Sequence, residues 1–322
     1  MKFKSLLAIL SVFTILFLAA CGNSSEQEEK ADKDKEGTNT EDTSYTVEHA
    51  MGATKLDKTP EKVVILTNEG TEALLSMGVT PVGAVQSWTG DPWYDHITDE
   101  MKDVQVVGTE SEVNVEAIAA LQPDLIIGNK MRQEKIYDQL NDIAPTIFAE
   151  TLRGDWKENF ELYAKAINKE EEGKKVLADY DSRIEEIKTS LGDKLDQEVS
   201  IVRFMAGDVR IYHKDSFSGV ILDQIGLARP ESQNVDDFAE NNATKERIPA
   251  MDGDVLFYFT YETGDGEANK LAKEWLEDPL FKNLKVAQEG NVHEVSDTIW
   301  NTAGGVKAAN LLLDDIEKYL LK

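Results

Sequence analysis

The chain has 322 residues and a formal net charge of −27, with 61 acidic against 34 basic side chains. So acidic a protein is repelled by nucleic-acid phosphates and anionic bilayers, which excludes binding to either by charge alone. A single cysteine excludes disulfides within the chain, so a packed apolar core must hold the fold together.

The first twenty residues have the composition of a secretory signal. Lys2 and Lys4 precede an apolar run that is too short for a stable membrane span. The run ends in Leu-Ala-Ala-Cys21, which resembles the lipobox of bacterial lipoproteins. The resemblance implies that residues 1–20 are removed, and that lipid on Cys21 anchors the protein to the cell membrane on its extracellular face. Residues 21–44 offer no aliphatic side chain larger than alanine, which predicts a disordered tether.

Beyond the tether, apolar runs rich in β-branched residues alternate with segments of helical spacing. The runs lie at 63–66, 81–85, 125–127, 146–148, 199–202, 255–259 and 292–295. Helical spacing occurs at 69–77 and 131–143, and it continues without interruption from 156 to about 195. This alternation is typical of parallel α/β units.

The pattern predicts an α/β fold with two Rossmann-like lobes, at 45–168 and 196–322, joined by a single long backbone helix at 169–195. One continuous sheet with a helical insertion is the alternative. An internal repeat favours two lobes, because the segments beginning at Glu116 and Glu246 both place isoleucine two residues on and aspartate eight residues on. Each segment predicts a short helix opened by its glutamate, followed by a strand that the aspartate introduces.

The chain from Tyr45 to its end resembles the helix-backbone class of ABC-importer substrate-binding proteins, which includes binders of ferric siderophores, haem and cobalamin. The matching motifs lie at 47–52, 59–64 and 72–83, and the most specific runs from Asn114 through Leu-Gln-Pro-Asp to 127. The resemblance implies a ligand cleft between the lobes. It also implies that Glu116 and Glu246, one on each lobe, form salt bridges with arginines of a membrane permease. Capping their own helices is the alternative role for both glutamates, and the two roles are compatible.

The histidines do not predict a bare metal site. They lie at positions 49, 96, 213 and 293, without the paired spacing of transition-metal ligands. A ligand that carries its own metal inside chelating oxygens needs arginines for the oxygens and aromatic side chains for its flanks. Open α/β sheets bind ligands at the carboxyl ends of their strands. On this basis the candidate ligand-binding residues are Arg132, Arg203, Arg210, Trp88, Tyr258 and Trp300, with Tyr261 as a further aromatic candidate.

Other roles are open for these residues: a surface ion pair for each arginine, and an outward-facing position on its strand for Tyr258. Within the class, the chain is most similar to the iron-hydroxamate and citrate-hydroxamate binding lipoproteins of Gram-positive bacteria. This implies a tethered monomer that captures a ferric siderophore and delivers it to a permease driven by cytoplasmic ATPases. Iron would enter only as the chelate, with no cofactor of the protein's own.

Two other functions are weighed against this one. A haem or cobalamin binder would have the same fold. A secreted lipoprotein hydrolase would need a Gly-x-Ser-x-Gly or a His-Glu-x-x-His motif, and the sequence has neither, so no enzyme is expected. Because one long helix resists wide hinge bending, the lobes should close only slightly around a largely preformed cleft.

Overall fold

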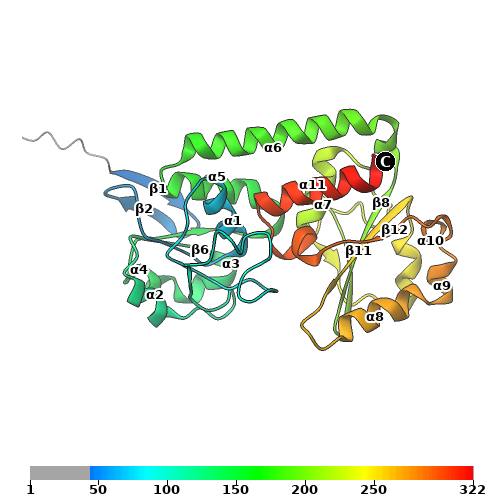
Figure 1. Cartoon of the computed structure of the whole chain (residues 1–322), viewed down its shortest axis with the longest axis horizontal. Coiled ribbons are helices and arrows are strands. Elements are labelled where there is room, and N and C mark those ends of the chain that lie inside the picture. Colours follow the sequence, from blue (N-terminus) through cyan, green and yellow to red (C-terminus); the bar gives the residue numbers. More distant parts are fainter. Residues whose placement is uncertain (1–43, 322) are drawn as a thin grey trace, which may run out of the picture. The chain divides into compact units, whose positions relative to one another are not determined.

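The computed structural model describes residues 44–321, which form a separate two-stranded hairpin and two five-stranded β-sheets with helices packed on their faces. The first sheet has the strand order β5-β4-β3-β6-β7, and the second has the order β10-β9-β8-β11-β12. Figure 1 shows each five-stranded sheet in its own lobe, with the long helix α6 (Glu170–Leu191) running along both. The prediction of a two-lobe α/β fold is confirmed, and a continuous sheet is excluded.

The first lobe has an all-parallel sheet that follows a short antiparallel hairpin. The hairpin pairs β1 (Tyr45–His49) with β2 (Gly52–Leu56). The sheet strands are β3 (Val63–Ile65), β4 (Gly83–Ala84), β5 (Gln105–Val106), β6 (Leu125–Asn129) and β7 (Thr146–Ala149). The helices are α1 (Asn68–Ser76), α2 (Val115–Leu121), α3 (Lys130–Gln133), α4 (Tyr137–Asn141) and α5 (Trp156–Ala166).

The segment 131–143 is not one helix, as its spacing suggests, but two short helices with a 3₁₀ turn between them. The buried side chain of Gln133 accounts for the break. Its oxygen accepts from the Asn129 amide, and its nitrogen donates to the carbonyls of Leu66 and Glu110. These bonds hold the end of α3 against the sheet, and the backbone leaves the helical angles at Gln133, where φ is −117°, and again at Ile136, where φ is −111°.

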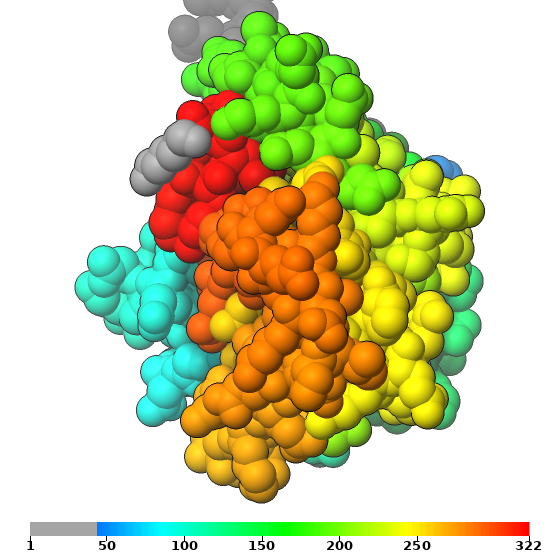
Figure 2. All heavy atoms as spheres, turned by 90° about the vertical axis from the view of Figure 1, so that its right-hand side faces the viewer, coloured from blue at the N-terminus to red at the C-terminus, as the bar shows by residue number. Residues whose placement is uncertain are grey.

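The second lobe combines parallel and antiparallel pairing. Its strands are β8 (Val199–Met205), β9 (Asp208–Tyr212), β10 (Ala239–Glu240), β11 (Val255–Tyr261) and β12 (Val292–Glu294). Its helices are α7 (Phe217–Ile225), α8 (Glu267–Leu276), α9 (Pro279–Lys282), α10 (Lys285–Glu289) and α11 (Val306–Leu320). Figure 2 faces this lobe and shows the orange segment that holds α8 to α10 spread across its front.

The antiparallel part of this sheet was not expected from the alternation of strand and helix signals. Strand β9 returns beside β8 after the turn Ala206-Gly207, where Gly207 has a φ of 75°. Glycine adopts this left-handed conformation at little cost, which makes a tight hairpin possible. Strand β10 then pairs antiparallel with β9.

The internal repeat has the same structural role in both lobes. In the first lobe, Asp124 Oδ2 accepts from the amides of Glu61 and Lys62, just before β3. In the second lobe, Asp254 Oδ2 accepts from the Glu198 amide, just before β8. Each aspartate directly precedes a strand, as the repeat predicts, and it also joins the start of that strand to the start of the neighbouring parallel strand.

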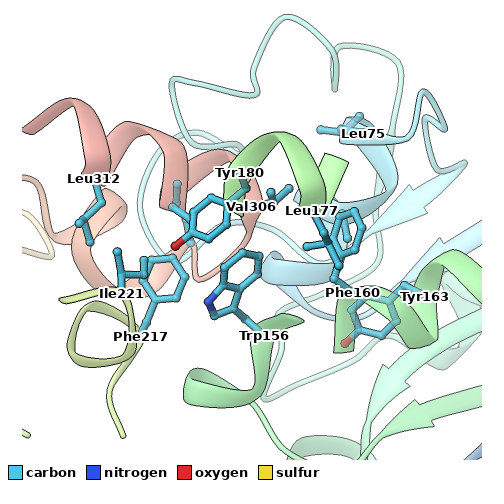
Figure 3. Close-up of a cluster of buried hydrophobic side chains, with 14 of the residues drawn as sticks. Leu75, Trp156, Phe160, Tyr163, Leu177, Tyr180, Phe217, Ile221, Val306 and Leu312 are labelled. Atoms are coloured by element: carbon cyan, nitrogen blue, oxygen red, sulfur yellow. The ribbon is translucent and has the colours of Figure 1, made fainter. Parts of the chain in front are cut away.

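One apolar core runs beneath both lobes. The helix α6 (Glu170–Leu191) buries Leu177, Tyr180 and Ile184 against it. Figure 3 shows Trp156 of α5 beside Tyr180 of α6 and Phe217 of α7, with Val306 and Leu312 of α11 nearby. The Trp156 ring meets the Tyr180 ring edge-on at 5.1 Å and the Phe217 ring at 6.3 Å between centroids. The lobes are thus joined by shared packing as well as by the connecting chain.

Candidate functional site

A cavity of about 380 Å³ lies where the carboxyl ends of strands from the two lobes face each other. The first lobe contributes Glu69, Trp88, Glu110, Arg132 and Leu152. The second lobe contributes Arg203, Met205, Arg210, Phe217, Phe238, Tyr261 and residues 301–304. Strand ends are where open α/β sheets place their ligands, and the volume suits a small molecule.

Arg132 and Trp88 form the wall on the side of the first lobe. Arg132 lies on α3, directly after β6, and its guanidinium carbon is 5.7 Å from the centre of the Trp88 ring. Its Nε lies 3.8 Å from Glu110 Oε2, and its side chain is 37% exposed. The arginine is therefore held from two sides while it remains accessible to a ligand.

Arg203 and Arg210 lie on the opposite wall, on the hairpin of β8 and β9. Arg203 is buried and makes a forked ion pair with Asp297, with Nε to Oδ1 at 2.6 Å and Nη2 to Oδ2 at 3.2 Å. Its guanidinium also lies 4.8 Å from the centre of the Tyr261 ring. Arg210 donates to Asp208 Oδ2 at 3.0 Å.

Two buried carboxyl groups also reach the cavity. Glu110 Oε1 accepts from the amide and from the side chain of Asn68, at 2.7 and 2.8 Å. Burial raises the pKa of Glu110, against the opposing effects of the Asn68 bonds and the Arg132 charge. Glu69 lies in the first turn of α1, and burial raises the pKa of its carboxyl to about 8. The cavity therefore has carboxyl groups among its arginines.

Four of the six residues predicted to bind ligand line this cavity, namely Trp88, Arg132, Arg203 and Arg210. The further candidate, Tyr261, lines it too.

The other two predicted residues do not reach the cavity. Trp300 has no exposed surface; it packs 4.5 Å from the Phe257 ring and donates from Nε1 to Asp315 at 2.9 Å. Tyr258 packs against Phe204, and its hydroxyl donates to Glu294 at 3.3 Å. The expected cleft position is therefore wrong for both side chains: one fills the core beneath α11, and the other lies along the sheet.

The prediction missed Glu69 and Glu110. Glu69 follows β3 just as Arg132 follows β6, so the strand-end rule pointed to this position as well. The sequence pattern placed Glu69 only in the helical segment 69–77. No sequence signal identifies Glu110, which lies in a loop beyond the short strand β5.

The family model for periplasmic binding proteins matches residues 63–298. The chain belongs to this family. It is 54% identical, over 99% of both chains, to a probable siderophore-binding lipoprotein of Bacillus subtilis. It is 30% identical to the Fe(3+)-citrate-binding protein of the same organism, over 98% of this chain and 97% of that one.

Among solved structures, Staphylococcus aureus SirA complexed with staphyloferrin B is similar to this periplasmic binding protein, with a TM-score of 0.81 and 34% identity. The match covers 86% of this chain and 98% of SirA. The resemblance to a siderophore-binding family that the sequence motifs indicated is confirmed.

The two glutamates of the repeat lie on the surface of the binding protein, one on each lobe. Glu116 is exposed in the first turn of α2, whose N-cap is Asn114. Glu246 is exposed in the first turn of the 3₁₀ helix Lys245–Met251, where its Oε2 accepts from Thr244 at 3.3 Å. Both positions fit a carboxylate at a helix start, and both leave the side chain accessible to another protein.

Within residues 44–321, no group of three or more His, Cys, Asp or Glu side chains is placed to hold a metal ion. The same part of the chain contains no helix long and apolar enough to cross a membrane. The predicted signal, the lipidation site at Cys21 and most of the tether lie outside the described residues.

Proposed function

We propose that this protein is an extracytoplasmic, lipid-anchored binding protein that captures a ferric siderophore for an ABC importer. The observation that carries the proposal is the cavity between the lobes, where Arg132, Arg203 and Arg210 meet the aromatic rings of Trp88 and Tyr261. The N–H groups of an arginine guanidinium can donate to the chelating oxygens of a siderophore, and the aromatic rings can contact its apolar parts. An iron already enclosed by oxygens needs no ligand from the protein.

A hydroxamate or citrate-hydroxamate is the siderophore class that we propose. Each arginine of the cavity already faces a carboxylate of this chain, so the walls do not hold a large surplus of positive charge. A tris-catecholate, with three negative charges, needs more compensation than a neutral or singly charged hydroxamate complex. The relatives support the broader class, since one is a probable siderophore binder and another binds Fe(3+)-citrate.

A titration of tryptophan fluorescence tests this proposal. The protein, purified in mild detergent, is titrated with a ferric hydroxamate, a ferric citrate-hydroxamate, a ferric catecholate, haem and cobalamin. Saturable quenching by a hydroxamate-type chelate at submicromolar concentration is the expected result. Binding of haem or cobalamin alone would preserve the role of a binding protein and reject the siderophore.

Trp88→Phe should remove most of the quenching in that titration. Trp88 is the half-buried tryptophan on the cavity wall, whereas the other four are at most 5% exposed. Quenching by a bound ferric chelate falls steeply with distance, so the nearest indole should dominate the signal. Trp275→Phe is the matched control, because Trp275 lies on α8 and packs against Phe204 in the core of the second lobe, and it should leave the quenching intact. Equal losses in the two variants would contradict this position for the ligand.

We further propose that Glu116 and Glu246 dock on arginines of the permease. Reversing both charges, Glu116→Lys with Glu246→Lys, should lower cellular uptake of the labelled ferric siderophore by about tenfold or more, because like charges would then meet at the contact. The affinity of the purified protein for the siderophore should not change, since neither side chain lines the cavity. Glu171→Lys, at an exposed site on α6, is the control that should keep uptake. Normal uptake by the double variant would reject the docking role.

A further inference from the structure

Glu69 is a buried acid that has no role so far in the proposed function. It is 6% exposed, in the first turn of α1, yet it lines the cavity. Behind it lie the apolar side chains of Trp156, Phe160 and Val306. A carboxyl group in such a place loses much of its hydration, which disfavours the charged form.

The hydrogen bonds to Glu69 are unevenly divided between its two oxygens. Asn159 Nδ2 donates to Oε1 at 2.7 Å, and the Tyr163 hydroxyl donates to the same oxygen at 2.9 Å. Among the described residues, none donates a hydrogen bond to Oε2. A carboxylic acid has one oxygen that only accepts and one that carries the proton, so this pattern suits a neutral acid with its proton on Oε2.

The charged groups around Glu69 do not supply a counterion. Glu110 and Asp155 face it with negative charge and, like burial, raise its pKa, while the bonds from Tyr163 and Asn159 lower it. The arginines of the cavity are each paired with another carboxylate: Arg132 with Glu110, Arg203 with Asp297, and Arg210 with Asp208. Among the described side chains, none therefore forms an ion pair with Glu69.

We propose that Glu69 contacts the bound ferric chelate as a neutral carboxylic acid and donates a hydrogen bond from Oε2 to one of its oxygens. This inference rests on the proposed function, and it adds a proton donor to the arginine contacts. Hydroxamate and carboxylate oxygens are strong acceptors, and a neutral acid approaches them without repulsion. The ligand would supply the partner that Oε2 does not find within the described chain.

The proposal fixes the direction of a pH dependence. The form of Glu69 that binds the chelate is protonated. In the protein without ligand, the pKa of Glu69 is about 8. The affinity for the chelate is therefore constant below about pH 8 and falls as the pH rises through this value. Above that pH, each further unit should cost about a factor of ten in affinity until the bound acid also ionises. Below the pKa of Glu69 in the unliganded protein, no proton is exchanged when the chelate binds. Above this pKa, Glu69 takes up one proton on binding.

The test uses the purified protein and a ferric trihydroxamate that is neutral between about pH 6 and 9, so that only the protein titrates. Dissociation constants are measured across this range for the wild type, Glu69→Gln, Glu69→Leu, Glu110→Gln and Glu112→Gln. Glu112 is an exposed carboxylate outside the cavity and serves as the matched control. Calorimetry of the wild type in buffers of different ionisation enthalpy counts the protons taken up.

We expect the wild type and Glu112→Gln to lose affinity above about pH 8, and Glu69→Gln to show a flat profile. Glu69→Leu should bind about ten- to hundredfold more weakly at acidic pH, because it has no donor. The proposal is overturned if the affinity of Glu69→Gln falls with pH as it does in the wild type. It is also overturned if only Glu110→Gln loses this pH dependence. If the variants do not fold, absence of proton uptake by the wild type at pH above about 8 overturns it as well. Failure of every ferric siderophore to bind at any pH instead rejects the proposed function.

Discussion

Arg203→Met is expected to lower the affinity for the ferric siderophore by at least about a hundredfold and to destabilise the protein by about 3–5 kcal/mol. The two effects have one origin. Arg203 presents its guanidinium to the cavity while it neutralises the buried carboxylate of Asp297. Without the arginine, the ligand loses its guanidinium contact on this wall, and Asp297, which is 7% exposed, is left as an unpaired buried charge.

A second variant separates these effects. Combining Arg203→Met with Asp297→Leu replaces the ion pair by apolar side chains, which is often neutral for stability. The double variant should regain most of the lost unfolding free energy in urea titrations, but it should not regain ligand binding. If Arg203→Met unfolds at the same urea concentration as the wild type and binds the siderophore normally, the Arg203–Asp297 pair contributes neither to stability nor to ligand binding.

Glu72→Ala should lower the unfolding free energy by about 3 kcal/mol, although Glu72 touches no ligand. Glu72 has no exposed surface and joins the two lobes. Its Oε2 accepts from the Ala308 amide at 2.9 Å, in the first turn of α11, while its Oε1 lies 2.5 Å from His96 Nε2. Alanine would leave the start of α11 and the half-buried imidazole without their partner.

The matched control is Glu100→Ala. Glu100 also reaches α11, through a salt bridge of 2.5 Å to Lys307, but its side chain is 43% exposed. Exposed pairs contribute little, so this variant should lose less than about 1 kcal/mol. Urea titration of both variants decides whether burial, and not merely a contact between the lobes, sets the contribution of Glu72. Equal losses of unfolding free energy in the two variants would show that burial does not set the contribution of Glu72.

The strands β3, β4, β6, β7, β8, β11 and β12 and the repeat could be predicted from the sequence, because local pattern determines them. The sequence pattern did not predict β5, β9 and β10. The sequence predicts that each aspartate of the repeat introduces a strand, and the structure adds a bond from each aspartate to the start of the neighbouring parallel strand. The same reasoning placed the three arginines at the cleft, and all three line the cavity, although Arg210 lies in the middle of β9 and not at a strand end. Trp88 follows the apolar run 81–85, and the same rule placed it at the cavity, which it lines.

The same reasoning failed for Trp300 because its surroundings come from a distant segment. The loop around it is polar, but α11 folds back over it, and Asp315 accepts its indole N–H. For Tyr258 the error lies in the end of the strand. The sequence signal for β11 stops at Phe259, whereas the strand continues to Tyr261, which is the tyrosine that reaches the cavity. A sequence predicts the presence of a strand more accurately than the residue at which the strand ends. A site that is located from the end of a strand can therefore be displaced by a few residues.

The apolar core shared by the lobes also bears on selectivity. Trp156, Tyr180 and Phe217 come from three helices, and any wide change in the separation of the lobes would pull their rings apart. Close-packed aromatic contacts resist such a change. The width of the cavity is therefore a property of the protein before the ligand arrives. The protein should therefore select among chelates of different size by their steric fit to the cavity. Substitutions on the cavity walls can then change the preferred siderophore without any change in the core.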